Sequence, residues 1–256
     1  MSSSVRSLTL LGVFVIVLLF GISSFVSVAA FTISPNIVSK TTTNYAAGYF
    51  LESTSAPGNI VAKGSWTVPT GSSCNSAEND IIYGMGIGAG LAVASDLYCP
   101  SVGGATEYFL FCSYNSIDVC PTTVPPTDTM SAGDKIRASL SLTYSTLAVT
   151  IMIKDMTKGW TYTGTGTDTV GVSEFAYWFL EGPDNSLPMV FTTVKTTGDS
   201  ATLGGHTGSL GSFMSVKGDT LYQYTYIDTV NNHTLASTTS IISKSTSFNV
   251  DFVQVS

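Results

Sequence analysis

The sequence is short of charge, and above all of positive charge. Only 11% of its 256 residues are charged, with 10 Lys and Arg against 17 Asp and Glu, and no stretch gathers basic residues into a stripe. Because nucleic-acid binding depends on clustered cations that neutralise phosphates, this composition argues against a nucleic-acid partner. A hydrophobic share of 44% and a mean hydropathy of +0.31 exclude a disordered chain.

The sequence also lacks an amphipathic helix. From residue 40 onward, short runs of alternating apolar and polar residues are separated by Gly, Ser and Thr, which is the pattern of half-buried strands. Residues 136–142 and 147–153 alternate on either side of a short turn and predict a hairpin. Many short strands at this spacing predict an all-β fold, an antiparallel two-sheet β-sandwich. Further strands are predicted at 60–68, 108–114, 175–181, 189–196, 221–228 and 247–255.

Signatures of cofactor and metal chemistry are missing as well. Four glycines alternate at 84–90, but their spacing is not that of a dinucleotide-binding loop and no crossover helix follows. The two histidines, His206 and His233, lie far from the cysteines, and no cysteine pair has the close spacing of a zinc site. We therefore expect neither a cofactor nor a metal. Asn232 begins an Asn-His-Thr triplet, which predicts an N-glycosylation site.

The N-terminal segment predicts export. It carries one charge, Arg6, followed by an apolar run at 8–30 that ends in small residues acceptable to a signal peptidase. We expect a cleaved signal peptide. The alternative is a single membrane anchor, because about 20 apolar residues suffice to span a bilayer. Both alternatives place the protein outside the cytoplasm, secreted or anchored at the cell surface, with a membrane contact only through residues 8–30.

Three segments follow from this interpretation. Residues 1–30 are the signal peptide or anchor, and residues 31–43, which include three consecutive threonines, are interpreted as a tether. Residues 44–256 contain no internal linker and are predicted to form the sandwich, a size within the range of one all-β domain.

Four cysteines fall within one fifth of the chain: Cys74, Cys99, Cys112 and Cys120. An exported protein can form disulfides, and four cysteines allow three connectivities. We favour Cys74 with Cys99 and Cys112 with Cys120, because these loops are short and local. The alternative is a set of free buried thiols.

The phrase Ala-Tyr-Trp-Phe-Leu-Glu at 176–181 is one of several longer phrases that follow one another in a characteristic order and spacing. Together these phrases resemble the eqolisins, which are glutamic endopeptidases. The corresponding phrase of that family is Ala-Glu-Trp-Ile-Val-Glu. The resemblance implies two packed antiparallel sheets and an acid-acting endopeptidase, in which a Glu activates water and a Gln stabilises the oxyanion. It covers nearly all of residues 44–250, and its other phrases lie at 44–49, 64–69, 131–134, 187–188 and 191–194.

Both catalytic positions implied by the resemblance are substituted. The glutamate of the family phrase falls on Tyr177, and the glutamine falls on Val93. The only glutamines, Gln223 and Gln254, lie far from this segment. The carboxylate of Glu181 shares the face of Tyr177 in a strand, yet four residues correspond to about 13 Å, far beyond the reach of a general base.

Three functions remain open at this point. We favour an exported, non-catalytic peptidase homologue that binds an extended peptide or a surface protein and tolerates acid. The first alternative is an active acid endopeptidase with displaced catalytic residues, for which Glu181 is the fallback carboxylate. The second is a carbohydrate-binding sandwich. In each case aromatic rings of the groove are the expected binding residues, because such rings bury a large area beside a polar group: Trp66, Tyr177 and Phe179.

Overall fold

The computed structural model describes residues 39–55, 58–76, 79–88, 91–114, 117–118, 130–168, 174–183, 187 and 189–253. The predicted signal peptide or anchor and most of the predicted tether lie outside these residues. Within the described part of the chain, no helix is long and apolar enough to cross a membrane. The segment from Pro35 onward forms one compact unit.

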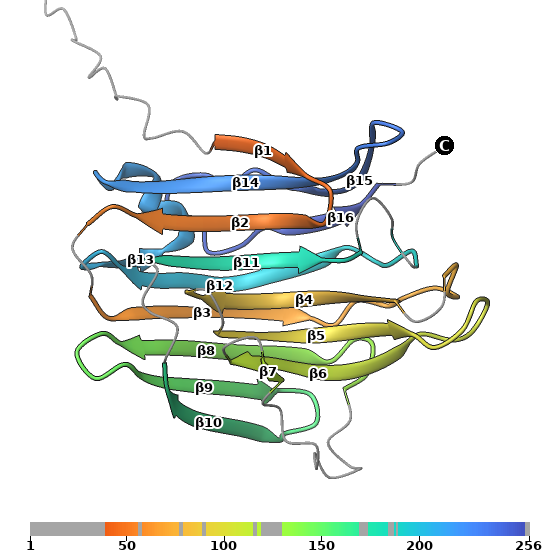
Figure 1. Ribbon diagram of the computed structural model, residues 1–256, viewed down its shortest axis with the longest axis horizontal. Helices are drawn as coiled ribbons and strands as arrows, with labels where there is room; N and C mark the ends of the chain where they lie inside the picture. Colours follow the sequence, from red (N-terminus) through yellow and green to blue (C-terminus); the bar gives the residue numbers. More distant parts are fainter. Residues whose placement is uncertain are drawn as a thin grey trace, which may run out of the picture. The chain divides into compact units, whose positions relative to one another are not determined.

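Two antiparallel layers make up this unit (Figure 1), and they confirm the predicted all-β sandwich. The first sheet runs in the order β1, β14, β2, β11, β4, β5, β6 and β7, and the second in the order β10, β9, β8, β3 and β12. The strands β16 and β15 pair between β12 and β14, so the two sheets are continuous along one side. β1 is the exception to the antiparallel order, because it pairs in parallel with β14.

The strands of the first sheet are β1 (Ser39–Thr43), β2 (Ala46–Ser53), β4 (Asn79–Ile87), β5 (Leu91–Cys99), β6 (Glu107–Tyr114), β7 (Ile117–Asp118), β11 (Phe175–Glu181) and β14 (Asp219–Asp228). The second sheet contains β3 (Ile60–Thr67), β8 (Lys135–Thr143), β9 (Ala148–Asp155), β10 (Thr161–Thr167) and β12 (Val194–Leu203). The remaining elements are β13 (His206–Ser209), a short 3-10 helix η1 (Leu210–Ser215), β15 (His233–Thr238) and β16 (Asn249–Phe252).

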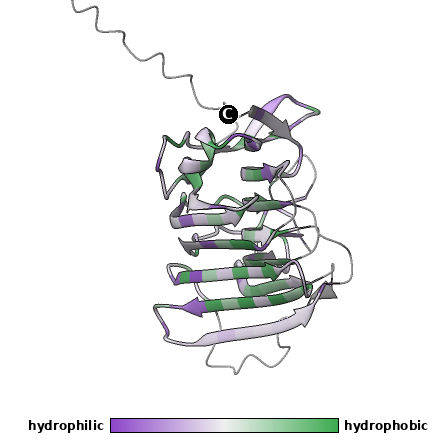
Figure 2. Ribbon diagram, turned by 90° about the vertical axis from the view of Figure 1, so that its left-hand side faces the viewer, coloured by the Kyte–Doolittle hydropathy of each residue, from purple (hydrophilic) through white to green (hydrophobic). Residues whose placement is uncertain are grey.

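Alternation of apolar and polar residues assigns one side of each strand to the core. In the hairpin of β8 and β9, every second residue is buried from Ile136 to Leu142 and again from Val149 to Ile153, while the strand residues between them face outward. The banding of hydropathy along the strands can be followed in Figure 2. The predicted hairpin is therefore confirmed, and the hydrophobic core lies between the two sheets.

Two sequence-based boundaries are corrected. The last five residues of the predicted tether form β1, because the run of β-branched threonines pairs with the open edge of β14. The strand predicted at 189–196 instead begins at Val194 and continues to Leu203. Before it, the chain pairs only through an isolated bridge between Phe191 and Gly71.

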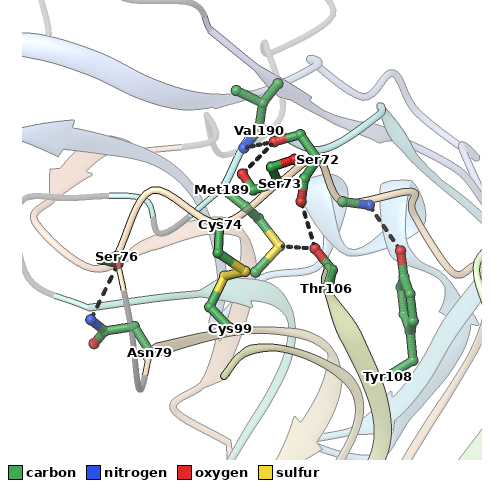
Figure 3. Close-up of a disulfide and its surroundings, with 11 residues drawn as sticks. Ser72, Ser73, Cys74, Ser76, Asn79, Cys99, Thr106, Tyr108, Met189 and Val190 are labelled. Atoms are coloured by element: carbon green, nitrogen blue, oxygen red, sulfur yellow. Dashed lines mark hydrogen bonds between the residues drawn. A yellow bond between two sulfur atoms is a disulfide. The ribbon is translucent and has the colours of Figure 1, made fainter. Parts of the chain in front are cut away.

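One predicted disulfide is confirmed. Cys74 and Cys99 are bonded, with 5.5 Å between their Cα atoms, and both are buried. Figure 3 shows the bridge beside Met189, whose sulfur accepts a hydrogen bond from the Thr106 hydroxyl at 3.4 Å. The bridge ties the loop before β4 to the end of β5. Cys112 is also disulfide-bonded, and its predicted partner at position 120 lies outside the described residues.

Candidate functional site

The outer side of β11 forms the centre of the candidate site. Its inward residues, Ala176, Trp178 and Leu180, are buried in the core, and its outward residues lie on the opposite face. This confirms the parity expected from strand alternation. The outward residues are Phe175, Tyr177, Phe179 and Glu181, so the structure places two of the three predicted groove aromatics together with the fallback carboxylate.

Tyr177 lies between two very different neighbours. On β2 its partner is Phe50, and on β4 its partner is Gly86. The tyrosine ring occupies the space above the glycine so closely that a Cβ atom at Gly86 would lie 2.1 Å from Cζ of Tyr177. Only glycine is compatible with this approach. The ring therefore fills the space above Gly86 on the outer side of the sheet.

An open pocket of about 300 Å³ lies beside this ring, between β1, β2, β11 and β14. We call it the groove pocket. Its walls are mostly aromatic, and Glu181 is the one carboxylate among its lining residues. The aromatic lining residues are Tyr45, Tyr49, Phe50, Phe175, Tyr177, Phe179 and Tyr224.

The aromatic rings of the groove pocket pack on one another. Phe50 is stacked with Tyr177 at a centroid distance of 6.4 Å, and Tyr177 contacts Phe179 at 5.0 Å. Burial, with a smaller contribution from the negative charge of Glu181, raises the pKa of Tyr177 to about 12. The phenol therefore stays protonated at neutral and acid pH. It cannot act as a base there, but it can donate a hydrogen bond.

Glu181 is the ionisable group of the pocket. Partial desolvation, followed by the nearby negative charge of Asp80, raises the pKa of its carboxyl above the ordinary value for a glutamate. Its side chain is nevertheless accessible to solvent. The two carboxylates give this end of the groove a negative potential, so it favours positively charged groups.

The structure does not bring Val93 and Tyr177 to one face. Val93 on β5 pairs with Met85 of β4, and both are fully buried in the core. The outward residues of β5 are its neighbours Ala92 and Ala94, opposite Gly86 and Gly84. None of these residues offers a carboxamide.

Glutamine is also missing from the described groove. Gln223 is the one glutamine among the described residues, and it points into the core from β14, where its Nε2 donates a hydrogen bond to the carbonyl of Thr238. Gln254 lies outside the described residues. The residues that line the pocket thus provide aromatic hydroxyls and one carboxylate, but no carboxamide to stabilise an oxyanion.

Trp66 is not a groove residue, which corrects the expectation from the sequence. It belongs to the inner side of β3 and is 4% exposed. Its Nε1 donates a hydrogen bond to the Ser95 hydroxyl at 2.8 Å, and its ring contacts Tyr83 edge to face. Trp66 therefore packs between the sheets, because its position has the inward parity of β3.

A buried carboxyl, which no pattern in the sequence indicated, lies behind the groove. Asp199 follows Gly198 at an irregularity in the pairing of β12 with β3, and it is fully buried. It accepts a hydrogen bond from the Thr196 hydroxyl. Burial raises the pKa of Asp199 to about 8, although this hydrogen bond favours the charged form. The carboxyl is therefore largely protonated at acid pH.

Most pocket residues outside β11 were missed by the sequence analysis. Phe50 and Tyr224 could have been predicted from strand alternation, since each lies at an outward position of a strand that the sequence pattern indicates. Tyr45 lies in the turn before β2, where no periodicity exists. Asn232 of the predicted glycosylation triplet is exposed in the turn between β14 and β15, with a positive φ of 56°.

Comparison with known proteins adds the family. The model of the peptidase A4 family matches residues 44–252, which is more than half of the chain. The chain belongs to the peptidase A4 family. The eqolisin resemblance seen in the sequence is thereby confirmed. No curated protein sequence matches the chain.

Solved structures support the same fold. Scytalido-glutamic peptidase with a peptide-based transition-state analogue is 18% identical, with a TM-score of 0.60, and the match covers 82% of this chain and 98% of that one. SCP-B, an eqolisin in complex with the tripeptide Ala-Ile-His, is also 18% identical, with the same coverage and a TM-score of 0.57. At this identity the likeness establishes the fold of the peptidase A4 family and leaves the chemistry to the site.

Proposed function

We propose that this chain is an exported, non-catalytic member of the peptidase A4 family that binds an extended peptide in its groove. The observation that supports the proposal is the position of the Tyr177 ring above Gly86. The sequence resemblance expects the catalytic carboxylate at this position, and an aromatic ring stands there instead. The pKa of this phenol lies near 12, so it cannot act as a base in acid.

Retention of the groove argues for binding. The outer side of the first sheet keeps a pocket of about 300 Å³ with aromatic walls, and two related structures hold a peptide or a peptide-based ligand. Aromatic walls with a carboxylate attract a cation, through the ring faces and through charge. We therefore expect a peptide with a Lys or Arg side chain near Phe179 and Glu181.

Fluorescence anisotropy can test binding with the purified full chain. The probe is an acetylated pentapeptide, Ala-Phe-Lys-Phe-Ala, compared with the same peptide containing norleucine in place of lysine. We expect the lysine peptide to bind about ten-fold more tightly, the order of magnitude of a cation–π contact with partial desolvation. Phe179→Ala should weaken binding. Tyr222→Ala is the matched control, since Tyr222 lies on the same face but does not line the pocket.

The outcomes separate the possibilities. Binding of neither peptide would contradict the peptide-binding function, and a panel of neutral glycans on the same protein would then test the carbohydrate alternative. Equal binding of both peptides would keep the function and contradict the preference for a cation.

A second candidate, an acid endopeptidase with displaced catalytic residues, is favoured by one observation. Glu181 has a raised pKa and lies in the pocket with the protonated Tyr177 phenol. We nevertheless expect the rate of hydrolysis of denatured protein between about pH 2 and 5 to be lower than that of a complete family member by a factor of about 100 to 1,000 or more. Loss of one hydrogen-bond donor to the oxyanion alone lowers the rate by about this factor. Cleavage that Glu181→Gln abolishes would establish the second candidate instead.

A further inference from the structure

The second sheet turns its outer side away from the groove, and this side holds half of the cations of the chain. The chain has 10 Lys and Arg in all. Five of them occupy outward positions of β3, β8, β9 and β12, as the strand registers show. We call these residues the basic face: Lys63, Lys135, Arg137, Lys154 and Lys195.

Carboxylates do not balance this charge on the same strands. The strands β3, β8, β9, β10 and β12 contain two acids, Asp155 and Asp199. Both are fully buried on the inner side. On these five strands the outward charge is therefore positive, although the formal net charge of the chain is -7.

The five cations lie close together. Arg137 and Lys154 are directly opposite each other on β8 and β9. Lys63 is opposite Ser139, two residues from Arg137 on β8, and Lys135 lies two residues from Arg137 in the other direction. With strands about 4.8 Å apart and a rise of about 3.3 Å per residue, the basic face measures roughly 15 Å in each direction.

This arrangement is unfavourable for the isolated protein. Like charges directly opposite each other on neighbouring strands are destabilising. Among the described residues, none of the five cations has an ion-pair partner. The ion pair between Lys158 and Asp134 lies outside the basic face. An anion supplied from outside would relieve this repulsion.

Hydroxyl groups surround the cations. The outward positions between and beside them are mostly Ser and Thr, and each hydroxyl can donate and accept hydrogen bonds. The surface therefore offers both charge and hydrogen bonds over several strands. These hydroxyl residues include Ser65, Thr67, Ser139, Ser141, Thr150, Thr161, Thr163, Thr197 and Ser200.

We propose that the basic face binds an anionic polysaccharide, a chain of sugars that carries sulfate or phosphate groups. The cations are spread over four strands and do not converge on one point, so they match a partner with several separate anionic groups. The interspersed hydroxyls match the hydroxyls of sugars. Charge complementarity with the basic face thus selects this partner, independently of the groove pocket.

Surface plasmon resonance on the purified full chain tests the proposal, with dextran sulfate as the probe and uncharged dextran as its reference. We expect binding to dextran sulfate alone. The affinity should fall about ten-fold or more when the salt concentration is raised from about 0.05 to 0.5 M, because exposed charges are screened. A variant that combines Lys63→Gln, Arg137→Gln and Lys154→Gln should bind at least about ten-fold more weakly, because each substitution removes one contact between a cation and an anionic group.

A matched control removes three cations elsewhere. Lys40→Gln, Lys217→Gln and Lys244→Gln combined change the net charge by the same amount at exposed positions outside the basic face. We expect this variant to bind within about two-fold of the wild type, since distant charges are screened. A thermal melt checks that both variants fold, and the three single variants replace the first combination if it does not fold.

Four results would overturn the proposal. The first is absence of binding to dextran sulfate at low salt. The second is equal weakening by both combinations, which would indicate a response to net charge alone. The third is tighter binding to vesicles of phosphatidylserine than to dextran sulfate at equal charge, which would indicate a membrane as partner. The fourth is self-association in sedimentation that the Lys63, Arg137 and Lys154 substitutions abolish, which would indicate a second copy of the chain.

Discussion

The two outer faces of the sandwich are built by the same strand alternation and carry opposite charge. The groove face of the first sheet presents aromatic rings above glycine and alanine, and its outward charged residues on β2, β4, β5, β6 and β11 are all acidic. The outer face of the second sheet presents cations among hydroxyls. The inner positions thus determine the fold, and the outward positions are free to differ. The acidic residues are Glu52, Asp80, Asp96, Glu107 and Glu181.

This contrast also shows why net charge can mislead. The sequence has no basic stripe, and its composition argues against a nucleic-acid partner. Yet Lys63, Arg137 and Lys195 are far apart in the sequence and become neighbours only through the pairing of β3 with β8 and β12. A local cluster of charge on a sheet therefore follows from register, which composition does not contain.

Substitutions on β11 give the strongest test of the difference between inner and outer positions, because Trp178 belongs to the core and its neighbour Tyr177 belongs to the groove. Trp178→Ala should destabilise the protein by about 3–5 kcal/mol, because a fully packed core ring is removed. Tyr177→Ala should cost clearly less, since its ring covers an open groove, and should enlarge the pocket. Urea unfolding measures both. Equal losses would mean that Tyr177 belongs to the core.

A second pair of substitutions compares the two sides of β5. Val93→Gln places a carboxamide in the core and should destabilise by about 1–3 kcal/mol. Ala92→Gln places the same group on the outward side of β5 opposite Gly86 and should cost less than Val93→Gln, although Ala92 is itself only 6% exposed. Combined with Tyr177→Glu, only the Ala92→Gln variant should gain acid-dependent cleavage. A gain with Val93→Gln instead would show that Val93 faces the groove.

Much of the fold follows from the sequence, but the site follows only in part. The relative faces of residues 175–181 were predictable because successive residues of a strand point to opposite sides, and the whole range forms one strand, β11. The face of Val93 was not, because β5 is buried on both sides over its first five residues and so has no alternation. Trp66 shows the same limit, since the family phrase that contains it does not reveal which side of β3 it occupies. The pocket joins several strands, and only register brings them together.

The core between the two faces predicts a dependence of stability on pH. The pKa of Asp199 is about 8 in the folded protein, against about 3.9 for an unperturbed aspartate. The folded state therefore binds this proton more tightly, and its stabilising effect is complete below about pH 4 and lost as the pH rises towards 8. Urea unfolding should show about 1 kcal/mol or more of extra stability at pH 5 relative to pH 7.5.

Two variants assign this effect. Asp199→Asn keeps the shape of the side chain and cannot ionise, so most of the difference between the two pH values should disappear. Asp251→Asn is the control, because Asp251 lies on the outer side of β16 and accepts a hydrogen bond from Thr193. A wild-type protein that is equally stable at both pH values would contradict the expectation.

The smallest expected effect concerns the repulsion on the basic face. Lys154→Glu places a carboxylate opposite Arg137 and turns a like-charge pair into an opposite-charge pair, which should stabilise the protein by about 0.2–1 kcal/mol. In an Arg137→Gln background the gain should vanish, and the difference between the two backgrounds measures the coupling. The same substitution should weaken binding to dextran sulfate. A Lys154→Glu variant that is more stable but binds dextran sulfate less tightly would show that the cations on this face serve a partner at the expense of stability. Loss of stability in Lys154→Glu would show that Arg137 and Lys154 do not repel each other.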